Sequence, residues 1–194
     1  MAMVEVKKIE DLPNWKSMSQ DFLKWADNRS VEEIWRECPR GDWLMHLAIL
    51  LNLEEELIYW ATLKCIIPSA MKYISINEKR PYTAVDAAYG YLHGFSTLKN
   101  LRAAIKSAWD AEASYSIRDN KAEREAIRAM AETAEIVDEN GSLGCALSAL
   151  SSASSAKEIG EGVQAKNEFL YNSAEIIRKE LPYYEIESAL IPYS

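Results

Sequence analysis

The chain has 194 residues, of which 48% are hydrophobic, and its net charge is −8. A chain of this length suits one domain that buries roughly 70% of the surface exposed in its unfolded state, which excludes a disordered protein or one that depends on disulfides. The acidic balance disfavours nucleic-acid binding, because phosphate contacts need clustered Lys and Arg. The negative charge is concentrated in residues 81–194, which carry 11 Lys and Arg against 17 Asp and Glu.

Two features of the sequence bear on the compartment. The N-terminus, MAMVEVKKIEDLPNW, lacks the apolar stretch of a signal peptide, and the apolar runs are far shorter than the roughly 20 residues of a membrane span. Cys38, Cys65 and Cys145 are widely spaced and form no C-x-x-C pair. We therefore interpret them as small hydrophobic side chains in a reducing compartment rather than as a zinc or redox site. The expected location is cytoplasmic, with no membrane association and no cofactor.

The first third of the chain predicts short helices around a sharp corner. Apolar side chains recur at helical spacing over 14–26, and Ser30 with Glu33 forms a capping-box pattern for a helix over 31–37. Pro39 ends that helix, since the residue before a proline avoids the α region. The densest apolar run follows in IWRECPRGDWLMHLAILL, where we expect Asp42 to be the N-cap of a buried central helix.

The remaining segments also predict helices. One is opened by three glutamates and interrupted by Pro68, a second starts at Pro81 and stops at Gly94, and a third is capped by Ser96 or Thr97. Alanine-rich helices fill the second half, and Pro182 ends the last helix. No segment shows the sustained alternation of a strand. The prediction is an all-α fold: a single domain over 14–182 with about eight to nine helices in an antiparallel array or orthogonal bundle and no sheet. Residues 1–13 form an N-terminal segment and residues 183–194 a C-terminal tail.

A search for chemistry finds no nucleotide-binding, zinc-protease or nucleophile-elbow motif. Asp42 and His46 lie four residues apart on one predicted helix and could act as an acid–base pair. The alternative is a helix cap beside a partly buried imidazole, which is the more common arrangement. We predict no enzyme, no catalytic residues and no metal site, and keep a small-molecule enzyme or binder with a pocket near His46 as an alternative.

One charge feature stands out in the second half. Between Arg128 and Lys157 there is no Lys or Arg. The acidic residues in and just after this window are Glu132, Glu135, Asp138, Glu139, Glu158 and Glu161. They fall at the two ends of a predicted helix and would form two acidic patches. They are either a solvated face or a docking surface for a basic partner.

Several strings resemble a known family. IWRECPRGDWLMHLA is similar to the opening signature of bacterial immunity proteins of the Imm5-like family, a Trp-Arg-x-Cys-x-Arg-x-Asp-Trp-Leu string before an apolar helix. NEKRPYTAVDAAYGYLHG, STLKNLRAAIKSAWDAEASY and SAEIIRKELP resemble later helices of that family. The chain departs from the pattern at His46, where the family usually has a second tryptophan. The likeness covers most of residues 31–182.

The resemblance implies an all-helical cytosolic protein that neutralises a co-encoded toxin by binding it, and it transfers no catalytic or ligand residues. Basic nuclease toxins are the class that suits an acidic inhibitor. The alternative is a helical scaffold or accessory protein of a mobile element without a toxin partner. On either reading we expect the Ile34 to Leu51 stretch to organise the fold and the acidic residues to form the contact surface.

Overall fold

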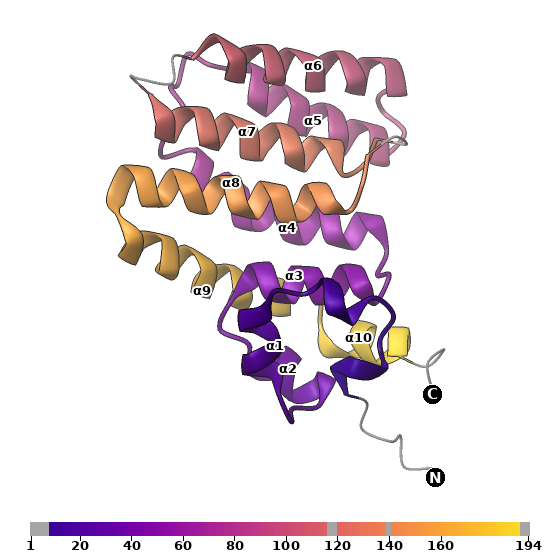
Figure 1. Ribbon diagram of the computed structural model, residues 1–194. Helices are drawn as coiled ribbons and strands as arrows, with labels where there is room; N and C mark the ends of the chain where they lie inside the picture. Colours follow the sequence, from indigo (N-terminus) through magenta and orange to yellow (C-terminus); the bar gives the residue numbers. More distant parts are fainter. Residues whose placement is uncertain (1–7, 116–119, 139–140, 191–194) are drawn as a thin grey trace.

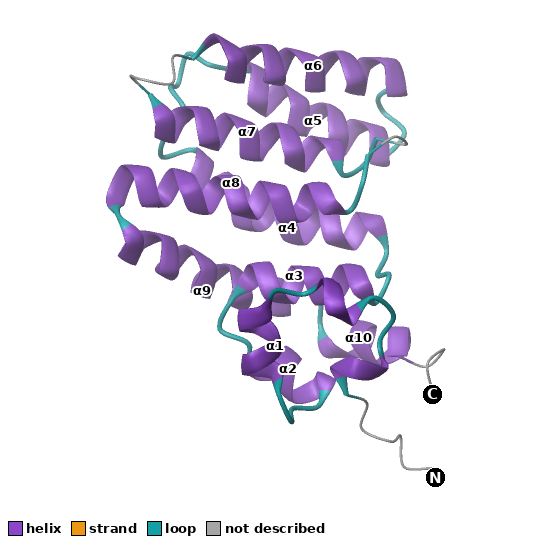
Figure 2. Cartoon of the chain, in the orientation of Figure 1, coloured by secondary structure: helices purple, strands orange, loops and turns teal. Residues whose placement is uncertain are grey.

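The computed structural model describes residues 8–115, 120–138 and 141–190. Within these ranges the chain forms helices and no strand, apart from one isolated bridge between Lys8 and Ser30. Figure 2 shows this all-helical composition. The α-helices are α1 (Gln20–Ala26), α2 (Val31–Glu37), α3 (Gly41–Leu50), α4 (Glu55–Ala70), α5 (Arg80–Leu92), α6 (Leu98–Ser114), α7 (Lys121–Glu135), α8 (Gly144–Glu161), α9 (Val163–Glu180) and α10 (Tyr183–Leu190).

The long helices form two layers (Figure 1). Helices α6, α7, α8 and α9 follow one another across one layer, and α5, α4 and α3 lie behind them in contact with the same neighbours. The short helices α1, α2 and α10 gather at one end of this array. The prediction of a single all-α domain without a sheet is therefore confirmed for the described residues.

Small residues determine how closely the helices pack. The α7–α8 contact is the most extensive in the fold, and its buried positions include many alanines, which let the two backbones approach. The tightest approach is between α3 and α9. A Cβ added to Gly41 would lie 2.4 Å from Cβ of Ser173, so only glycine fits at that position.

The N-terminal region differs from the prediction in two ways. The expected helix over 14–26 is broken into a 3-10 turn, Trp15–Ser17, and α1, because the Ser19 hydroxyl accepts a hydrogen bond from Phe22 N and starts a new helix. Asp42 is not an N-cap, since α3 begins at Gly41 and its capping position is the extended residue Arg40. The Asp42 carboxylate is instead engaged by the Arg40 guanidinium.

The C-terminal region contains a helix that the sequence analysis assigned to a tail. Helix α10 starts directly after Pro182 and buries Ile186 and Leu190, which are 0% and 9% exposed. Nearby, Arg178 of α9 donates to the carbonyl oxygens of Trp35 (3.3 Å) and Cys38 (2.8 Å) at the end of α2. Contacts between distant segments therefore hold this end of the molecule together.

Candidate functional site

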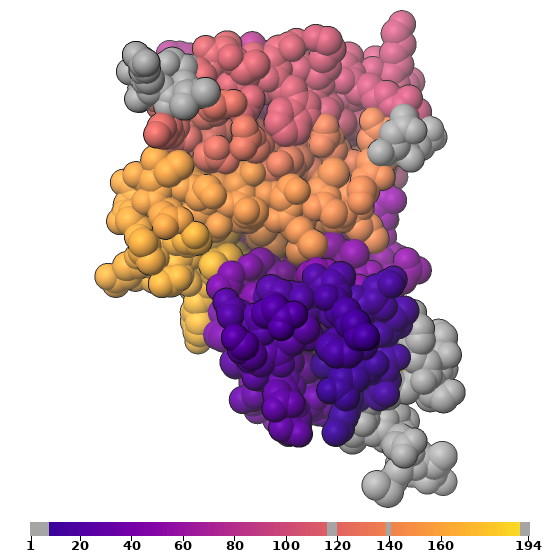
Figure 3. All heavy atoms as spheres, in the orientation of Figure 1, coloured from indigo at the N-terminus to yellow at the C-terminus, as the bar shows by residue number. Residues whose placement is uncertain are grey.

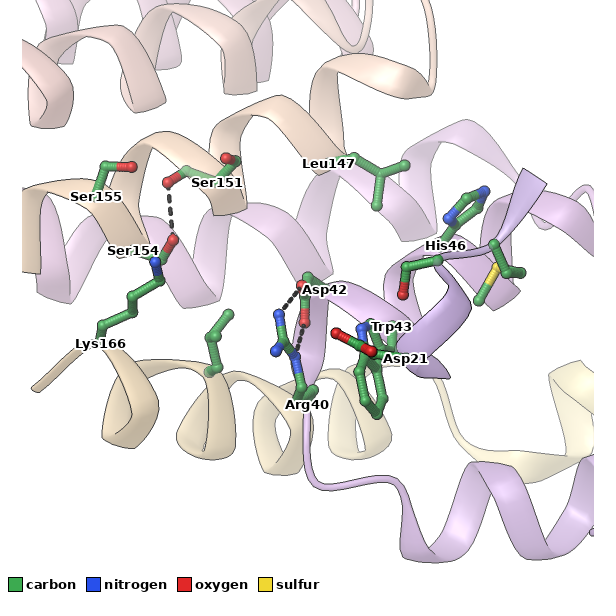
Figure 4. A pocket seen from close by; sticks show the side chains of 13 residues that line it. Asp21, Arg40, Asp42, Trp43, His46, Leu147, Ser151, Ser154, Ser155 and Lys166 are labelled. Carbon is green, nitrogen blue, oxygen red and sulfur yellow. Dashed lines mark hydrogen bonds and ion pairs between the residues drawn. The ribbon is translucent and has the colours of Figure 1, made fainter. Parts of the chain in front are cut away.

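A polar pocket lies where the N-terminal elements meet α3, α8 and α9. Figure 3 shows α8 and α9 (orange to yellow) meeting the N-terminal third (indigo to purple) along one line of the surface. The pocket has a volume of about 380 Å³ and is drawn in Figure 4. The residues that line it are Met18, Ser19, Asp21, Arg40, Asp42, Trp43, His46, Leu147, Ser151, Ser154, Ser155, Lys166 and Leu170. We refer to it below as the polar pocket.

Arg40 of the polar pocket contacts both a carboxylate and an aromatic ring. Arg40 donates from Nε (3.0 Å) and Nη2 (2.6 Å) to the two carboxylate oxygens of Asp42, a bidentate pair that fixes the plane of the guanidinium. The same guanidinium lies over the Trp43 ring, 4.7 Å from its centroid. From the sequence alone, Asp42 was expected to be a helix cap and the surrounding Ile34 to Leu51 stretch to organise the fold. The structure places Arg40, Asp42 and Trp43 on the wall of the pocket.

His46 lies at one end of the polar pocket (Figure 4). Its Nε2 is 3.2 Å from the Ser17 hydroxyl oxygen. Burial lowers the pKa of His46, while the negative charge of Asp42 acts in the opposite direction. No hydrogen bond joins Asp42 to His46 among the described residues, because the Asp42 carboxylate is turned towards Arg40. The structure therefore brings the two residues to one pocket without pairing them.

The opposite wall is formed by serines of α8. Ser151, Ser154 and Ser155 lie at i, i+3 and i+4, which places them on one face of the helix. Ser154 donates from its hydroxyl to the Ser151 carbonyl at 2.8 Å. Lys166 of α9 closes this end and pairs with Glu158 at 2.6 Å. This wall was not predicted from the sequence, although the spacing of the serines was a signal that could have indicated it.

The predicted acidic residues near the end of α7 are engaged with other side chains. Glu132 accepts from the Ser152 hydroxyl at 2.8 Å, and Glu135 accepts from the Trp109 indole at 2.6 Å. Asp138 receives bonds from Arg102 Nε and Nη2, the shortest of 2.8 Å. Burial is the main cause that raises the pKa of Glu132 to about 7. Glu139 lies outside the described residues.

The other two acidic residues lie at the far end of α8. Glu158 pairs with Lys166, whereas Glu161 pairs with Lys157 at 3.3 Å and also accepts hydrogen bonds from Lys72 and Tyr73. The bonds from Lys72 and Tyr73 lower the pKa of Glu161 to about 2. The described acidic residues thus form two separate groups with partners in the same chain. Their role in partner binding stays a prediction.

No group of three or more His, Cys, Asp and Glu side chains among the described residues is placed to hold a metal ion. None of the helices in the same part of the chain has the length and apolar character needed to cross a membrane.

Comparisons of the chain with family models, with curated proteins and with solved structures find no match. The likeness to Imm5-like immunity proteins therefore rests on the strings quoted above.

Proposed function

We propose that this chain is a non-catalytic, cytoplasmic protein-binding module that neutralises a cognate bacterial toxin by direct contact. The quoted strings support the proposal through their resemblance to immunity proteins. The structural observation that carries it is a row of aromatic rings on α4, α5 and the turn after α5, which runs from a half-buried tryptophan to an exposed phenylalanine. We call this row the aromatic ladder; it consists of Trp60, Tyr89, His93 and Phe95.

The rings of the aromatic ladder contact one another in sequence. Trp60 of α4 meets Tyr89 of α5 edge to face, with 5.6 Å between ring centroids. Tyr89 stacks on His93 at 4.3 Å, and His93 lies nearly parallel to Phe95 at 6.3 Å. The outer end is open to solvent, since Phe95 is 81% exposed and Tyr89 is 43% exposed. The ladder is therefore a continuous aromatic surface.

Such a surface suits protein recognition. Trp and Tyr are enriched among the residues that contribute most to binding energy, and large exposed aromatic groups are uncommon unless they bind something. Two exposed acidic residues lie beside the rings. Glu56 accepts from the Trp60 indole at 3.4 Å, and Asp86 precedes Tyr89 by one helical turn. Aromatic faces next to carboxylates attract guanidinium and ammonium groups, which supports a partner with exposed Arg or Lys.

The test uses the toxin candidate encoded beside this chain, co-expressed with it in bacteria. We expect a complex that co-purifies and restores growth, and we expect Phe95→Ala to weaken both. Ile76→Ala is the matched control, because Ile76 is also 81% exposed but does not belong to the ladder. Failure of the unaltered chain to bind or protect would overturn the proposal. If Phe95→Ala and Ile76→Ala weakened binding and protection equally, the aromatic ladder would not be the contact surface.

The polar pocket favours a second candidate function, the binding of a small molecule between helices. Its lining includes His46 together with the exposed Asp21 and the half-buried Asp42. The bidentate bond from Arg40 occupies the Asp42 carboxylate, so the geometry supports binding better than proton transfer.

A further inference from the structure

We infer that the polar pocket binds a neutral, polyhydroxylated small molecule of the monosaccharide or cyclitol class. This inference rests on the second candidate function, small-molecule binding in the same pocket, and is independent of toxin binding. It rests on the charge balance of the lining, on its free hydrogen-bonding groups and on its size.

The charges that line the polar pocket cancel. Arg40 and Lys166 are the cations, and Asp21 and Asp42 are the anions. Arg40 is matched by Asp42 within the lining, and Lys166 is matched by Glu158. Since burial favours the neutral form of His46, this residue adds no fixed charge at neutral pH. An anionic ligand would therefore find no unmatched cation in the lining. Asp21 is left without an ion pair among the described residues, but it is exposed, and solvent screens its charge, so the pocket favours a neutral ligand.

The pocket is nevertheless rich in groups that can bond a ligand. The hydroxyls of Ser151 and Ser155 form no hydrogen bond with other described residues, and Ser154 uses its proton but keeps its oxygen lone pairs. Arg40 commits Nε and Nη2 to Asp42 and leaves Nη1. The Arg40–Asp42 pair therefore presents the Nη1 donor of Arg40 beside the remaining lone pairs of the Asp42 carboxylate. Neighbouring hydroxyls of a polyol both donate and accept, so they match this pattern.

The size and the apolar part of the lining agree with this class. A volume of about 380 Å³ is far above that of one water and near the lower end of the range for small-molecule sites. Met18, Leu147 and Leu170 add apolar surface between the polar groups. A sugar ring combines polar edges with C–H faces and so can use both kinds of wall.

A zwitterion of amino-acid size is the competing ligand. Its ammonium group would pair with Asp21, which makes no ion pair with any described residue, and its carboxylate would lie near Lys166. Lys166 is already neutralised by Glu158, so the anionic half of such a ligand would gain less than the cationic half. The experiment separates the two classes.

The test is ligand-observed saturation-transfer NMR with the full chain and two sets of probes at millimolar concentration. The first set contains glucose, galactose, ribose and myo-inositol, and the second contains glycine, serine and glutamate. We expect transfer to at least one member of the first set. We expect Ser151→Phe, which fills the pocket, to abolish it, while Asn100→Phe at an exposed position of α6 outside the lining leaves it unchanged.

A milder variant guards against loss of folding. Arg40→Lys keeps the charge but cannot form the planar bidentate pair, and we expect it to weaken sugar binding by about tenfold with an unaltered circular dichroism spectrum. The inference is overturned if no sugar or cyclitol shows transfer, if the signal persists in Ser151→Phe, or if only the amino acids bind.

Discussion

Glu132 of α7 accepts a hydrogen bond from the Ser152 hydroxyl of α8 at 2.8 Å, across the most extensive helix contact of the fold. The carboxyl is partly buried, and burial raises its pKa to about 7, although the Ser152 bond and the charge of Arg128 act in the opposite direction. A residue of the predicted acidic surface therefore contributes to the junction between two core helices.

The burial of Glu132 predicts that the free energy of unfolding depends on pH. The pKa of Glu132 in the folded chain lies above its ordinary value of 4.5. Folding therefore favours the protonated carboxyl, and the stability associated with it is complete below about pH 4.5 and is lost as the pH rises through about 7. Glu132→Gln cannot ionise, so it should be more stable than the unaltered chain at pH 8 by about 1–2 kcal/mol, allowing for partial solvent screening.

The measurement is urea unfolding from pH 5 to pH 8. Glu187→Gln serves as the control, because Glu187 is exposed and forms no ion pair or hydrogen bond with the described residues. We expect the control to follow the unaltered chain at each pH. A constant difference between Glu132→Gln and the unaltered chain across the range would contradict the prediction.

Gly41→Ala should be strongly destabilising. Its Cβ would lie 2.4 Å from the Ser173 Cβ, 2.8 Å from the Ser173 carbonyl carbon and 2.9 Å from the Ala174 nitrogen. Two of these atoms are backbone, so α3 and α9 must separate, at a cost of about 1–3 kcal/mol. Gly144→Ala is the matched control, since its Cβ would meet only the Ser142 hydroxyl oxygen at 3.2 Å. Chemical denaturation measures both, and equal stability of the two variants would refute this reading of the α3–α9 contact.

Arg178→Met should destabilise the end of the molecule that holds α2. The variant loses the donors to the Trp35 and Cys38 carbonyls while it keeps an apolar stem, and the expected loss is about 1–3 kcal/mol. Lys179→Met is the control, because Lys179 is exposed and its side chain bonds no described residue. Hydrogen exchange should show faster exchange of the α2 amides in Arg178→Met than in the control. If the α2 amides exchanged at the same rate in both variants, the hydrogen bonds from Arg178 to the two carbonyls would not stabilise α2.

The three thiols should react at very different rates in the folded chain. Burial raises the pKa of Cys65 to about 12 and that of Cys38 to about 11, so neither is a thiolate at neutral pH. Cys145 is only half-buried. A thiol reagent at pH 8 should label Cys145 first and reach Cys38 and Cys65 only after unfolding. Mass spectrometry of the labelled peptides checks the order, and labelling of Cys65 at the rate of Cys145 would contradict it.

Much of the fold could be predicted from local patterns. The Ser30–Glu33 capping box is present, with the Ser30 amide bonded to Glu33 at 2.8 Å and the Glu33 amide bonded to Ser30 at 3.1 Å. The Ser30 and Glu33 pattern could predict the start of α2 because both bonds join residues only three positions apart. Thr97 likewise accepts from the amide of Asn100 at 3.2 Å, as a residue at that cap should. Helix type and approximate bounds follow from interactions of this range.

The candidate site could not be predicted in the same way. The sharp corner before α3 could be predicted from Pro39, but the pocket exists only because α8 and α9 return to that corner after more than 100 residues. The acidic residues show the reverse case. Asp138 was expected to contribute free negative charge, and the fold places Arg102 against it. Charge patterns along the chain do not reveal which opposite charges folding brings close.

The sequence by itself determined that this protein is a single all-helical domain, because helical periodicity, caps and the lack of strand alternation act over a few residues. Only the tertiary structure decided that Arg40, Asp42 and Trp43 face a polar pocket, that the outer end of the aromatic ladder is exposed and which side chains pair with the described acidic residues. The physical reason is that these arrangements depend on how helices pack. Packing is decided by contacts such as that of Gly41 with Ser173, which join residues far apart in the chain.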